Sequence, residues 1–167
     1  ECAELLSIDL QKKGVRIVEY SQAGGPSIFI KVADTLGIYW HLVADNDPEG
    51  QKYIEEAKTL LNGRPEADYV SSLTYPNIDI LLCCSGYGQP YLNGVGPKKK
   101  AKLEGLEIGS RQYWEQVYQI VNKTRGFSKP AAALRSILQM KESGPDGVPC
   151  ELKEILKRVE AIGGVAP

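Results

Sequence analysis

The hydrophobic pattern of the first half of the chain switches between the spacing of a strand and that of a helix. Residues 14–20, "GVRIVEY", alternate and are rich in β-branched side chains, which predicts a strand. Residues 38–44, "IYWHLVA", are almost entirely apolar, as in a strand buried on both faces, and residues 68–73, "DYVSSL", predict a third strand. Two stretches at helical spacing separate these strands, and their apolar residues are Ile28, Phe29, Val32, Ala33 and Leu36, then Tyr53, Ile54, Ala57, Leu60 and Leu61. The alternating order predicts an α/β fold with a parallel sheet flanked by helices.

The second half of the chain predicts helices. Residues 77–84, "NIDILLCC", predict a short helix, and three longer amphipathic helices form a C-terminal helical extension. Their apolar stripes are Tyr113, Trp114, Val117, Ile120 and Val121; Ala132, Leu134, Ile137 and Leu138; and Leu152, Ile155, Leu156 and Val159. Residues 85–109 are rich in glycine, proline and lysine and predict a long connection, which is uncommon in a compact domain unless it is functional or disordered. We expect an α/β core over residues 1–85 and a basic loop with the helical part over residues 86–167.

The composition limits which binding partners and which cellular compartment are expected for the protein. Twenty Lys and Arg residues against 21 Asp and Glu leave a net charge of −1, so any nucleic-acid contact must come from a local patch. The four cysteines lack C-x-x-C spacing, and the adjacent Cys83 and Cys84 are poorly placed to bridge each other, so we expect reduced thiols in a cytoplasmic protein. No apolar run approaches the roughly 18 residues of a membrane span, and the start is not a signal peptide. The first residues, "ECAELLSIDLQ", are typical of the end of a helix and suggest a cut inside a larger protein.

Two aspartates, Asp45 and Asp47, follow the apolar stretch 38–44. In an open parallel α/β sheet, ligands collect outside the carboxyl ends of the strands, and side chains two residues apart share a face. Two carboxylates held close raise each other's pKa unless a cation lies between them, and Mg²⁺ takes one or two carboxylates with water and substrate phosphate. The pattern therefore favours a divalent metal site. The alternative for Asp47 is a helix cap with Pro48 as the first helical residue, which leaves Asp45 unexplained, and Asp47 can serve as both cap and ligand.

Lysines supply the candidate phosphate contacts. In "RGFSKPAAALRSILQM", residues 125–140, a helix begins at Ser128 or Lys129, because Pro130 suits a first turn. A helix N-terminus with a cation nearby is a good phosphate site, and a solvated lysine is an equally good explanation of the pattern. The dense basic run in "GPKKKAK" comprises Lys98, Lys99, Lys100 and Lys102. Such a run can neutralise several DNA phosphates, but most lysine runs are merely solvated, so it favours nucleic acid only weakly.

Other chemistry has little support in the sequence. His41 is the sole histidine and lies inside an apolar stretch, where a satisfied core side chain is expected rather than a catalytic base. No Ser-His-Asp or Cys-His set can be assembled, and the glycines of "QAGGPS" lack the spacing of a P-loop or a dinucleotide fingerprint.

Three blocks of the sequence carry a resemblance to one known family. They are "VRIVEYSQAGGPSIFIKVADTLGIYWHLVADNDPEGQKYIEEA", "NIDILLCCSGYGQPYLNG" and "SKPAAALRSILQMKESGPDGVPCELKEIL". Together they resemble the C-terminal catalytic region of the class 2 OLD-family (overcoming lysogenization defect) endonucleases, which is built on a TOPRIM fold. The D-x-D alone is shared with topoisomerases and primases, whereas "SKPAAAL" and "GVPCELK" favour class 2. The resemblance spans nearly the whole chain.

The resemblance implies particular roles for four residues. Asp45 and Asp47 match the D-x-D metal ligands, Asp79 stands where the family has an acidic residue, usually glutamate, and Lys129 matches the lysine of the active centre. The shorter side chain at Asp79 leaves open whether it binds metal directly. The implied activity is that of a DNA nickase or endonuclease that hydrolyses phosphodiester bonds with two Mg²⁺ or Mn²⁺ ions, with Ca²⁺ as a non-productive substitute.

The resemblance also implies partners and further ligands. The partners are DNA, an N-terminal ABC-type ATPase domain of the same protein and a helicase encoded alongside, in phage defence. The family has further metal-binding glutamates in an E-G-x-T-E type sequence, which precedes the segment that matches "ECAELLSIDL". We therefore expect these ligands before Glu1, and we do not assign Glu1 or Glu4 as substitutes.

Two other functions stay open at the level of sequence. A non-catalytic TOPRIM-like module for DNA contact or docking needs no complete set of metal ligands. A phosphohydrolase of the haloacid dehalogenase type also places D-x-D after an apolar strand, with Asp45 as nucleophile and Asp47 as general acid, but the "SKPAAAL" block makes it the weaker alternative.

Overall fold

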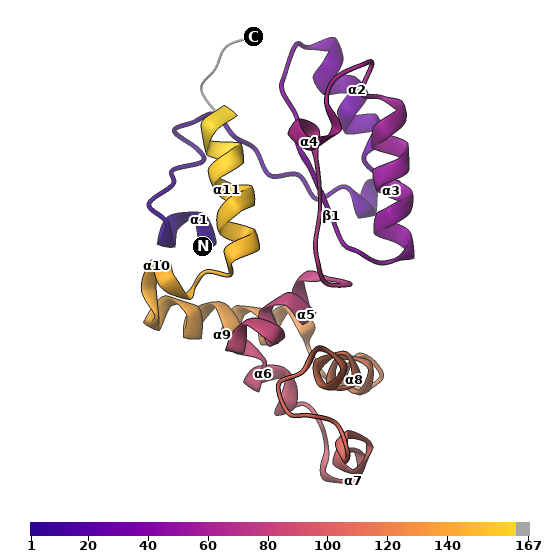
Figure 1. The fold of residues 1–167 in the computed structure, drawn as a ribbon, viewed down its shortest axis with the longest axis vertical. Helices are drawn as coiled ribbons and strands as arrows, with labels where there is room; N and C mark the ends of the chain where they lie inside the picture. The colour runs from indigo at the N-terminus through magenta and orange to yellow at the C-terminus, as the bar shows by residue number, and fades with distance from the viewer. Residues whose placement is uncertain (163–167) are drawn as a thin grey trace. The chain divides into compact units, whose positions relative to one another are not determined.

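A computed structural model describes residues 1–162, which form two compact units (Figure 1). The sheet unit is Ser7–Pro76 together with the C-terminal helix α11 (Cys150–Ile162). The helical unit is Glu1–Leu6 together with Asn77–Pro149. Compactness alone does not test the expected division into residues 1–85 and 86–167, because a domain is also defined by folding on its own.

The sheet unit is built around two short parallel strands, β1 (Leu42–Ala44) and β2 (Val70–Ser72), with Leu42 opposite Val70. The other elements of this unit are a 3₁₀ turn (Ser21–Ala23), α2 (Ser27–Thr35), α3 (Pro48–Thr59), α4 (Glu66–Tyr69) and α11. Helices α2 and α3 lie side by side in Figure 1. Their buried residues form one core with the strands: Ile30, Leu42, Ala44, Ile54, Ala57 and Val70. The predicted parallel pairing and the two predicted helices are therefore confirmed.

The expected strand over residues 14–20 is wrong, because these residues form no strand in the structure. Ile17 is 81% exposed and Val18 is 49% exposed, so the alternating apolar side chains meet no second layer. Composition indicates that a segment can form a strand, but a strand also needs the hydrogen-bonding groups of a neighbour. Within residues 1–162 the sheet has two strands, so the predicted order of three parallel strands is reduced to two.

Strand β1 is also shorter than the apolar stretch 38–44, because the first part of that stretch has other partners. The Trp40 indole donates to Asp34 Oδ1 at 3.0 Å and its ring lies 4.9 Å from that of Tyr69. The ring nitrogens of His41 are hydrogen-bonded to the Asp68 carbonyl (2.8 Å) and the Ser71 hydroxyl (2.9 Å). Burial lowers the pKa of His41. His41 therefore has hydrogen-bond partners for both ring nitrogens, as expected, but it is half-buried and not part of the core.

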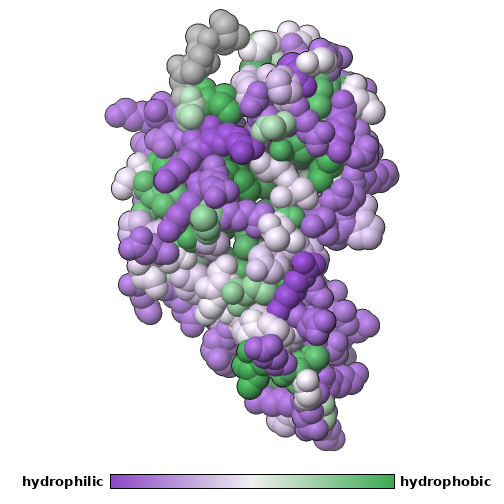
Figure 2. All heavy atoms as spheres, in the orientation of Figure 1, coloured by the Kyte–Doolittle hydropathy of each residue, from purple (hydrophilic) through white to green (hydrophobic). Residues whose placement is uncertain are grey.

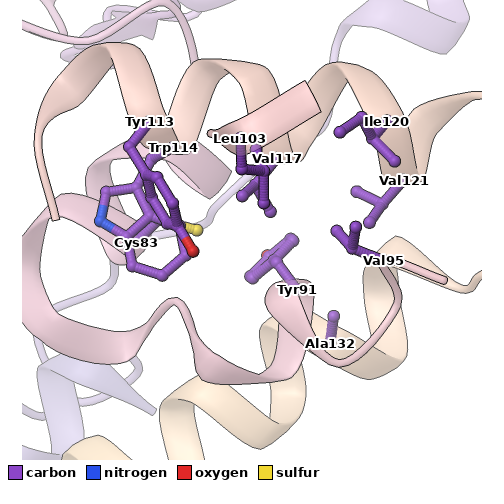
Figure 3. Packing of buried hydrophobic residues seen from close by; sticks show 10 residues of the cluster. All are labelled: Cys83, Tyr91, Val95, Leu103, Tyr113, Trp114, Val117, Ile120, Val121 and Ala132. Atoms are coloured by element: carbon purple, nitrogen blue, oxygen red, sulfur yellow. The ribbon is translucent and has the colours of Figure 1, made fainter. Parts of the chain in front are cut away.

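The helical unit contains short helices around two long ones. In chain order they are α1 (Cys2–Leu5), α5 (Ile78–Leu82), a π-helical turn (Cys83–Tyr87), α6 (Gln89–Leu92), α7 (Pro97–Lys100), a 3₁₀ turn (Ala101–Leu103), α8 (Arg111–Asn122), α9 (Lys129–Glu142) and α10 (Gly144–Gly147). Figure 3 shows Tyr91 of α6 in the middle of the core, facing the apolar side chains of α8. The predicted apolar stripe of α8 is buried throughout, as expected.

The expectation of a long connection over residues 85–109 is wrong. This segment forms the π-helical turn, α6, α7 and a 3₁₀ turn, and it places Tyr91, Val95 and Leu103 in the core with exposed fractions of 0, 3 and 8%. Glycine, proline and lysine obscured these helices in the sequence because each is only three to five residues long. Such short helices show no amphipathic periodicity, which needs a window of about 11 residues.

Helix α9 was predicted in its correct place but with the wrong buried face. Its buried residues are Ala132, Ser136 and Met140, whereas Leu134 and Leu138 are 55 and 52% exposed. Ser136 is fully buried because its hydroxyl donates to the Tyr87 carbonyl at 2.7 Å, which satisfies the polar group.

The structure bears on two further expectations. The four cysteines lie in the described part of the chain and form no disulfide there. No helix within residues 1–162 combines the length and the apolar character that crossing a bilayer requires. The described chain is thus mostly helical with a small parallel sheet and a C-terminal helix, while a TOPRIM fold stays a prediction.

Candidate metal and nucleic-acid site

Asp45 and Asp47 lie directly after β1, at the carboxyl end of the strand. Asp47 is the N-cap of α3, and its Oδ1 accepts from the Gly50 amide at 2.7 Å, with Pro48 as the first helical residue. The predicted cap is therefore confirmed, and it fixes the backbone and side chain of Asp47. A capping carboxylate has a second oxygen, so the cap is compatible with a metal ligand.

Gly50 brings the start of α3 against the backbone of Asp45. A Cβ atom at position 50 would lie 1.9 Å from the Asp45 carbonyl oxygen, which no side chain can tolerate without movement of the backbone. The sequence does not mark Gly50 as important, since a glycine in the first turn of a helix usually means only a low helix propensity at that position. Here it sets how closely the two aspartates and the helix N-terminus approach.

The loop that carries the aspartates is also tied to the end of β2. The Asn46 amide donates to the Tyr75 carbonyl at 3.3 Å, and the Leu73 amide donates to the Ala44 carbonyl at 2.9 Å. The Asn46 side chain accepts from Gln51 of α3 at 2.8 Å. The edge of the sheet at which ligands are expected is therefore held by hydrogen bonds from both sides.

Tyr20 is a site residue that the sequence did not single out. Its hydroxyl donates to the Val43 carbonyl at 3.2 Å, and its ring packs edge-to-face with Tyr53 at 5.3 Å between centroids. Burial raises the pKa of Tyr20 to about 12, and the next largest cause is the negative charge of Asp45, with Asp47 contributing as well. Tyr20 therefore lies near the negative charge of Asp45 and, to a smaller extent, that of Asp47.

Glu151 of α11 is a second residue that sequence reasoning missed. Its Oε1 accepts from the amide (2.6 Å) and the hydroxyl (3.1 Å) of Thr74, two residues beyond β2. Since β1 and β2 are parallel, Thr74 and Asp45 follow their strands at the same edge of the sheet. The other carboxylate oxygen of Glu151 is buried and has no hydrogen-bond partner among residues 1–162. The only signal in the sequence is an acidic residue after Pro149, which is ordinary for a first turn.

Asp79 belongs to the helical unit and lies in the first turn of α5. Its Oδ1 accepts from the hydroxyl of the fully buried Tyr91 at 2.5 Å. Burial raises the pKa of Tyr91, and the hydrogen bond to Asp79 raises it further. The pKa of the buried Cys83 is raised by burial and then by the charge of Asp79. Asp79 therefore has a structural role as the hydrogen-bond acceptor of the buried Tyr91 hydroxyl, and this role does not depend on metal binding.

Lys129 is the first residue of α9, whose N-cap Ser128 accepts from the Ala131 amide at 3.3 Å. The Lys129 ammonium donates to the Tyr118 hydroxyl at 3.2 Å and lies 5.3 Å from the centre of that ring. Tyr118 is close enough to Tyr91 for its charge to raise the pKa of that tyrosine. Lys129 thus contacts Tyr118 and Asp79 contacts Tyr91, and all four residues belong to the helical unit.

The lysine run occupies α7 and the 3₁₀ turn that follows it. Lys98, Lys100 and Lys102 are exposed. Lys99 differs, because it is partly buried and its ammonium donates to the Thr124 hydroxyl at 3.0 Å.

The predicted metal and catalytic residues are divided between the two compact units. Asp45 and Asp47 belong to the sheet unit, and Asp79 and Lys129 belong to the helical unit. Within the described residues, no group of three or more His, Cys, Asp and Glu side chains has an arrangement that could hold a metal ion. The convergence of all four residues on one centre stays a prediction.

Comparison with known proteins gives one similarity. The chain is 26% identical over 151 residues to a protein of Escherichia coli (strain K12) whose description is "Uncharacterized protein YbjD". The match covers 88% of this chain and 25% of that protein, so the chain spans about a quarter of the length of this relative. No protein-family model matches the sequence, and no solved structure matches it.

Proposed function

We propose that this chain is the catalytic part of a divalent-metal-dependent DNA endonuclease, with a TOPRIM-like fold and the chemistry of the class 2 OLD family. The observation that supports this most is the placement of Asp45 and Asp47 after β1, where the start of α3 fixes both and their charges act together on Tyr20. Two carboxylates with water and a substrate phosphate are a usual ligand set for Mg²⁺.

The carboxylates at this edge of the sheet are the kind of ligand that such an ion takes, although residues 1–162 hold no group of three metal-binding side chains. Asp45 and Asp47 would hold the ion, and the buried carboxylate oxygen of Glu151 at the same edge has no partner among residues 1–162. When bound, Mg²⁺ or Mn²⁺ would polarise the phosphate and lower the pKa of a bound water. The remaining ligands would come from water, from the DNA phosphate and from the further glutamates that the family resemblance implies.

Lys129 would stabilise negative charge on the phosphate. Its ammonium is held by the Tyr118 hydroxyl at the N-terminus of α9, where the helix dipole also favours an anion. Asp79 would act beside it, held by the Tyr91 hydroxyl. Exposed lysines of α7 and of the following turn would contact the DNA backbone, which positions DNA without reading its sequence.

The partners and the cellular location of the protein are also proposed from the resemblance. An ABC-type ATPase domain of the same protein and a helicase encoded alongside are proposed partners, on the resemblance of the sequence alone. A cytoplasmic location in phage defence is proposed on the same basis.

The first test is nicking of supercoiled plasmid in Mg²⁺ or Mn²⁺ by the protein and by Asp45→Asn. We expect the substitution to reduce nicking at least 100-fold, because it removes the negative charge of a metal ligand. The affinity for DNA in Ca²⁺ should stay within about twofold of that of the unmodified protein. Asp9→Asn is the matched control: Asp9 is an exposed carboxylate of the same unit, and asparagine keeps its hydrogen bond to the Lys12 amide. Unchanged nicking by Asp45→Asn would remove Asp45 from the mechanism.

A non-catalytic DNA-binding module is the second candidate, and one observation favours it. Residues 1–162 contain no three-membered group of metal-binding side chains. For this candidate the protein binds DNA with no nicking in either metal, and Asp45→Asn has no effect. Turnover of a small phosphate ester with a phosphoryl group trapped on Asp45 would instead support the phosphohydrolase.

A further inference from the structure

Residues 123–125, "KTR", join α8 to α9 and carry two exposed cations, Lys123 and Arg125. The sequence drew no attention to them, because two charges separated by one residue do not form a run. In the structure, Thr124 between them accepts a hydrogen bond from the Lys99 ammonium at 3.0 Å. Lys123 and Arg125 are therefore held next to the lysine run of α7, although they follow it by more than 20 residues.

A second contact fixes the same two segments. A Cβ atom on Gly94 would lie 2.3 Å from the ring of Phe127, so the backbone before α7 lies directly against the segment that follows "KTR". Phe127 also packs on the core cluster that contains Val95 and Val121. The placement of the two basic segments thus rests on a polar and an apolar contact together.

The charge of this region differs from that of the chain. Residues 96–129 contain eight Lys and Arg against three Asp and Glu, a net charge of +5, whereas the whole chain has −1. Of the acidic residues, Glu115 pairs with Arg111 at 2.7 Å, and Glu104 and Glu107 are exposed. On the face that Figure 2 shows, mostly hydrophilic side chains cover the part of the unit where Figure 1 labels α7 and α8.

We propose that Lys123 and Arg125 complete a phosphate-binding surface for the backbone of DNA. The basic surface, as we define it, consists of Lys98, Lys100, Lys102, Lys123 and Arg125, all of which are exposed. Lys99 is its positioning residue, since its ammonium is engaged with Thr124. Lysine and arginine side chains from two segments can bind a partner whose negative charges repeat along a strand, such as the phosphates of DNA. Such contacts do not depend on the base sequence.

This inference rests on the proposed function for the identity of the polyanion, since the DNA that is cut would lie on this surface. Lys129 follows Arg125 by four residues and begins α9. A strand held by Lys123 and Arg125 is therefore held by the segment that leads directly to the lysine proposed to act on the scissile phosphate.

The test measures binding of a fluorescently labelled 30-base-pair DNA duplex in EDTA over a range of NaCl concentrations. The variant Lys123→Gln/Arg125→Gln should bind at least tenfold more weakly near 0.1 M salt. The slope of log affinity against log salt should fall by about 1.8, because each lost phosphate contact removes about 0.9. The matched control is Lys12→Gln/Lys13→Gln, an exposed pair in the sheet unit with the same loss of charge, which should bind within twofold of the unmodified protein.

A second variant tests the positioning role without a change of charge. Thr124→Val removes the acceptor for Lys99, together with the hydrogen bond that the hydroxyl donates to the Ile120 carbonyl, and keeps the size of the side chain. We expect several-fold weaker binding at low salt, with melting temperature close to that of the unmodified protein. If Lys123→Gln/Arg125→Gln binds as tightly as the lysine control, or if the unmodified protein binds no DNA, the basic surface is refuted. Thr124→Val that binds like the unmodified protein refutes the positioning role of Lys99.

The outcome for the basic surface can be separated from that for the proposed function. Salt-dependent binding that Lys123→Gln/Arg125→Gln weakens, with no nicking in Mg²⁺ or Mn²⁺, supports the surface and contradicts the nuclease. Metal-dependent nicking with unchanged binding by that variant supports the nuclease and contradicts the surface.

Discussion

The position of Asp45 depends on a residue that has no side chain. Gly50 lets the first turn of α3 contact the Asp45 carbonyl, and the Gly50 amide also serves the Asp47 cap. One glycine therefore couples both aspartates to the helix N-terminus. This coupling could not be predicted from the sequence, because the contact is made in three dimensions between backbone atoms.

Replacing Gly50 with alanine should destabilise the protein even though alanine is favoured in helices. Alanine gains about 1 kcal/mol of helix propensity, but its Cβ would overlap the Asp45 carbonyl, so we expect a net loss of about 1–3 kcal/mol in the free energy of unfolding. Metal-dependent nicking should fall together with stability, because Asp45 is displaced. Urea unfolding and plasmid nicking measure the two effects.

Gly96→Ala is the control for this substitution, because a Cβ at Gly96 meets nothing within 4 Å. It should leave both stability and nicking nearly unchanged. A Gly50→Ala protein that is as stable and as active as Gly96→Ala would show that α3 does not position Asp45.

At the scale of elements, local signals located the longer helices but missed the short ones of residues 85–109, and they predicted one strand that does not form. The cap at Asp47 and the first-turn Pro48 marked the start of α3 correctly, and Gly37 ends α2, because the Ile38 amide donates to the Ala33 carbonyl at 2.8 Å. The segment 14–20 had strand composition but has no neighbour to pair with. The buried face of α9 was missed because the carbonyl of Tyr87 makes a serine acceptable in the core.

One link between elements predicts how stability depends on pH. Asp34, in the last turn of α2, receives two hydrogen bonds from Arg64, at 2.7 and 2.8 Å, and one from Trp40 at 3.0 Å. The hydrogen bond from the Arg64 guanidinium is the largest effect and holds the pKa of Asp34 below its ordinary value of 3.8. Burial opposes it, and the hydrogen bond from Trp40 lowers the pKa further. Since the pKa is lower in the folded state, this contribution to stability is present above pH 4 and is lost as the pH falls through the folded-state value.

Asp34→Asn should therefore lower the free energy of unfolding at pH 7 and lower it less at pH 3. The measurement is urea unfolding of both proteins at the two pH values. An equal loss at pH 7 and pH 3 would mean that the charge of Asp34 contributes nothing and that only its hydrogen bonds matter.

At the scale of the whole molecule, the proposed activity draws on both compact units. The two aspartates after β1 belong to the sheet unit, and Asp79, Lys129 and the basic surface belong to the helical unit. The sequence predicted these residues one by one, from a strand end, a helix start and a basic run. It could not predict Tyr20, Gly50 or Glu151, because their roles come from contacts between distant segments.

The most direct test of the central claim is calorimetric titration of the protein with Mn²⁺, compared with the variant Asp45→Asn/Asp47→Asn. Asparagine caps helices about as well as aspartate, so α3 should keep its start and the variant should fold. The control, Asp9→Asn/Glu107→Gln, removes two exposed carboxylates elsewhere. We expect the protein and the control to bind Mn²⁺ and the variant to bind at least tenfold more weakly. Equal binding by the variant, or no binding by the protein at millimolar Mn²⁺, would contradict a metal site at Asp45 and Asp47.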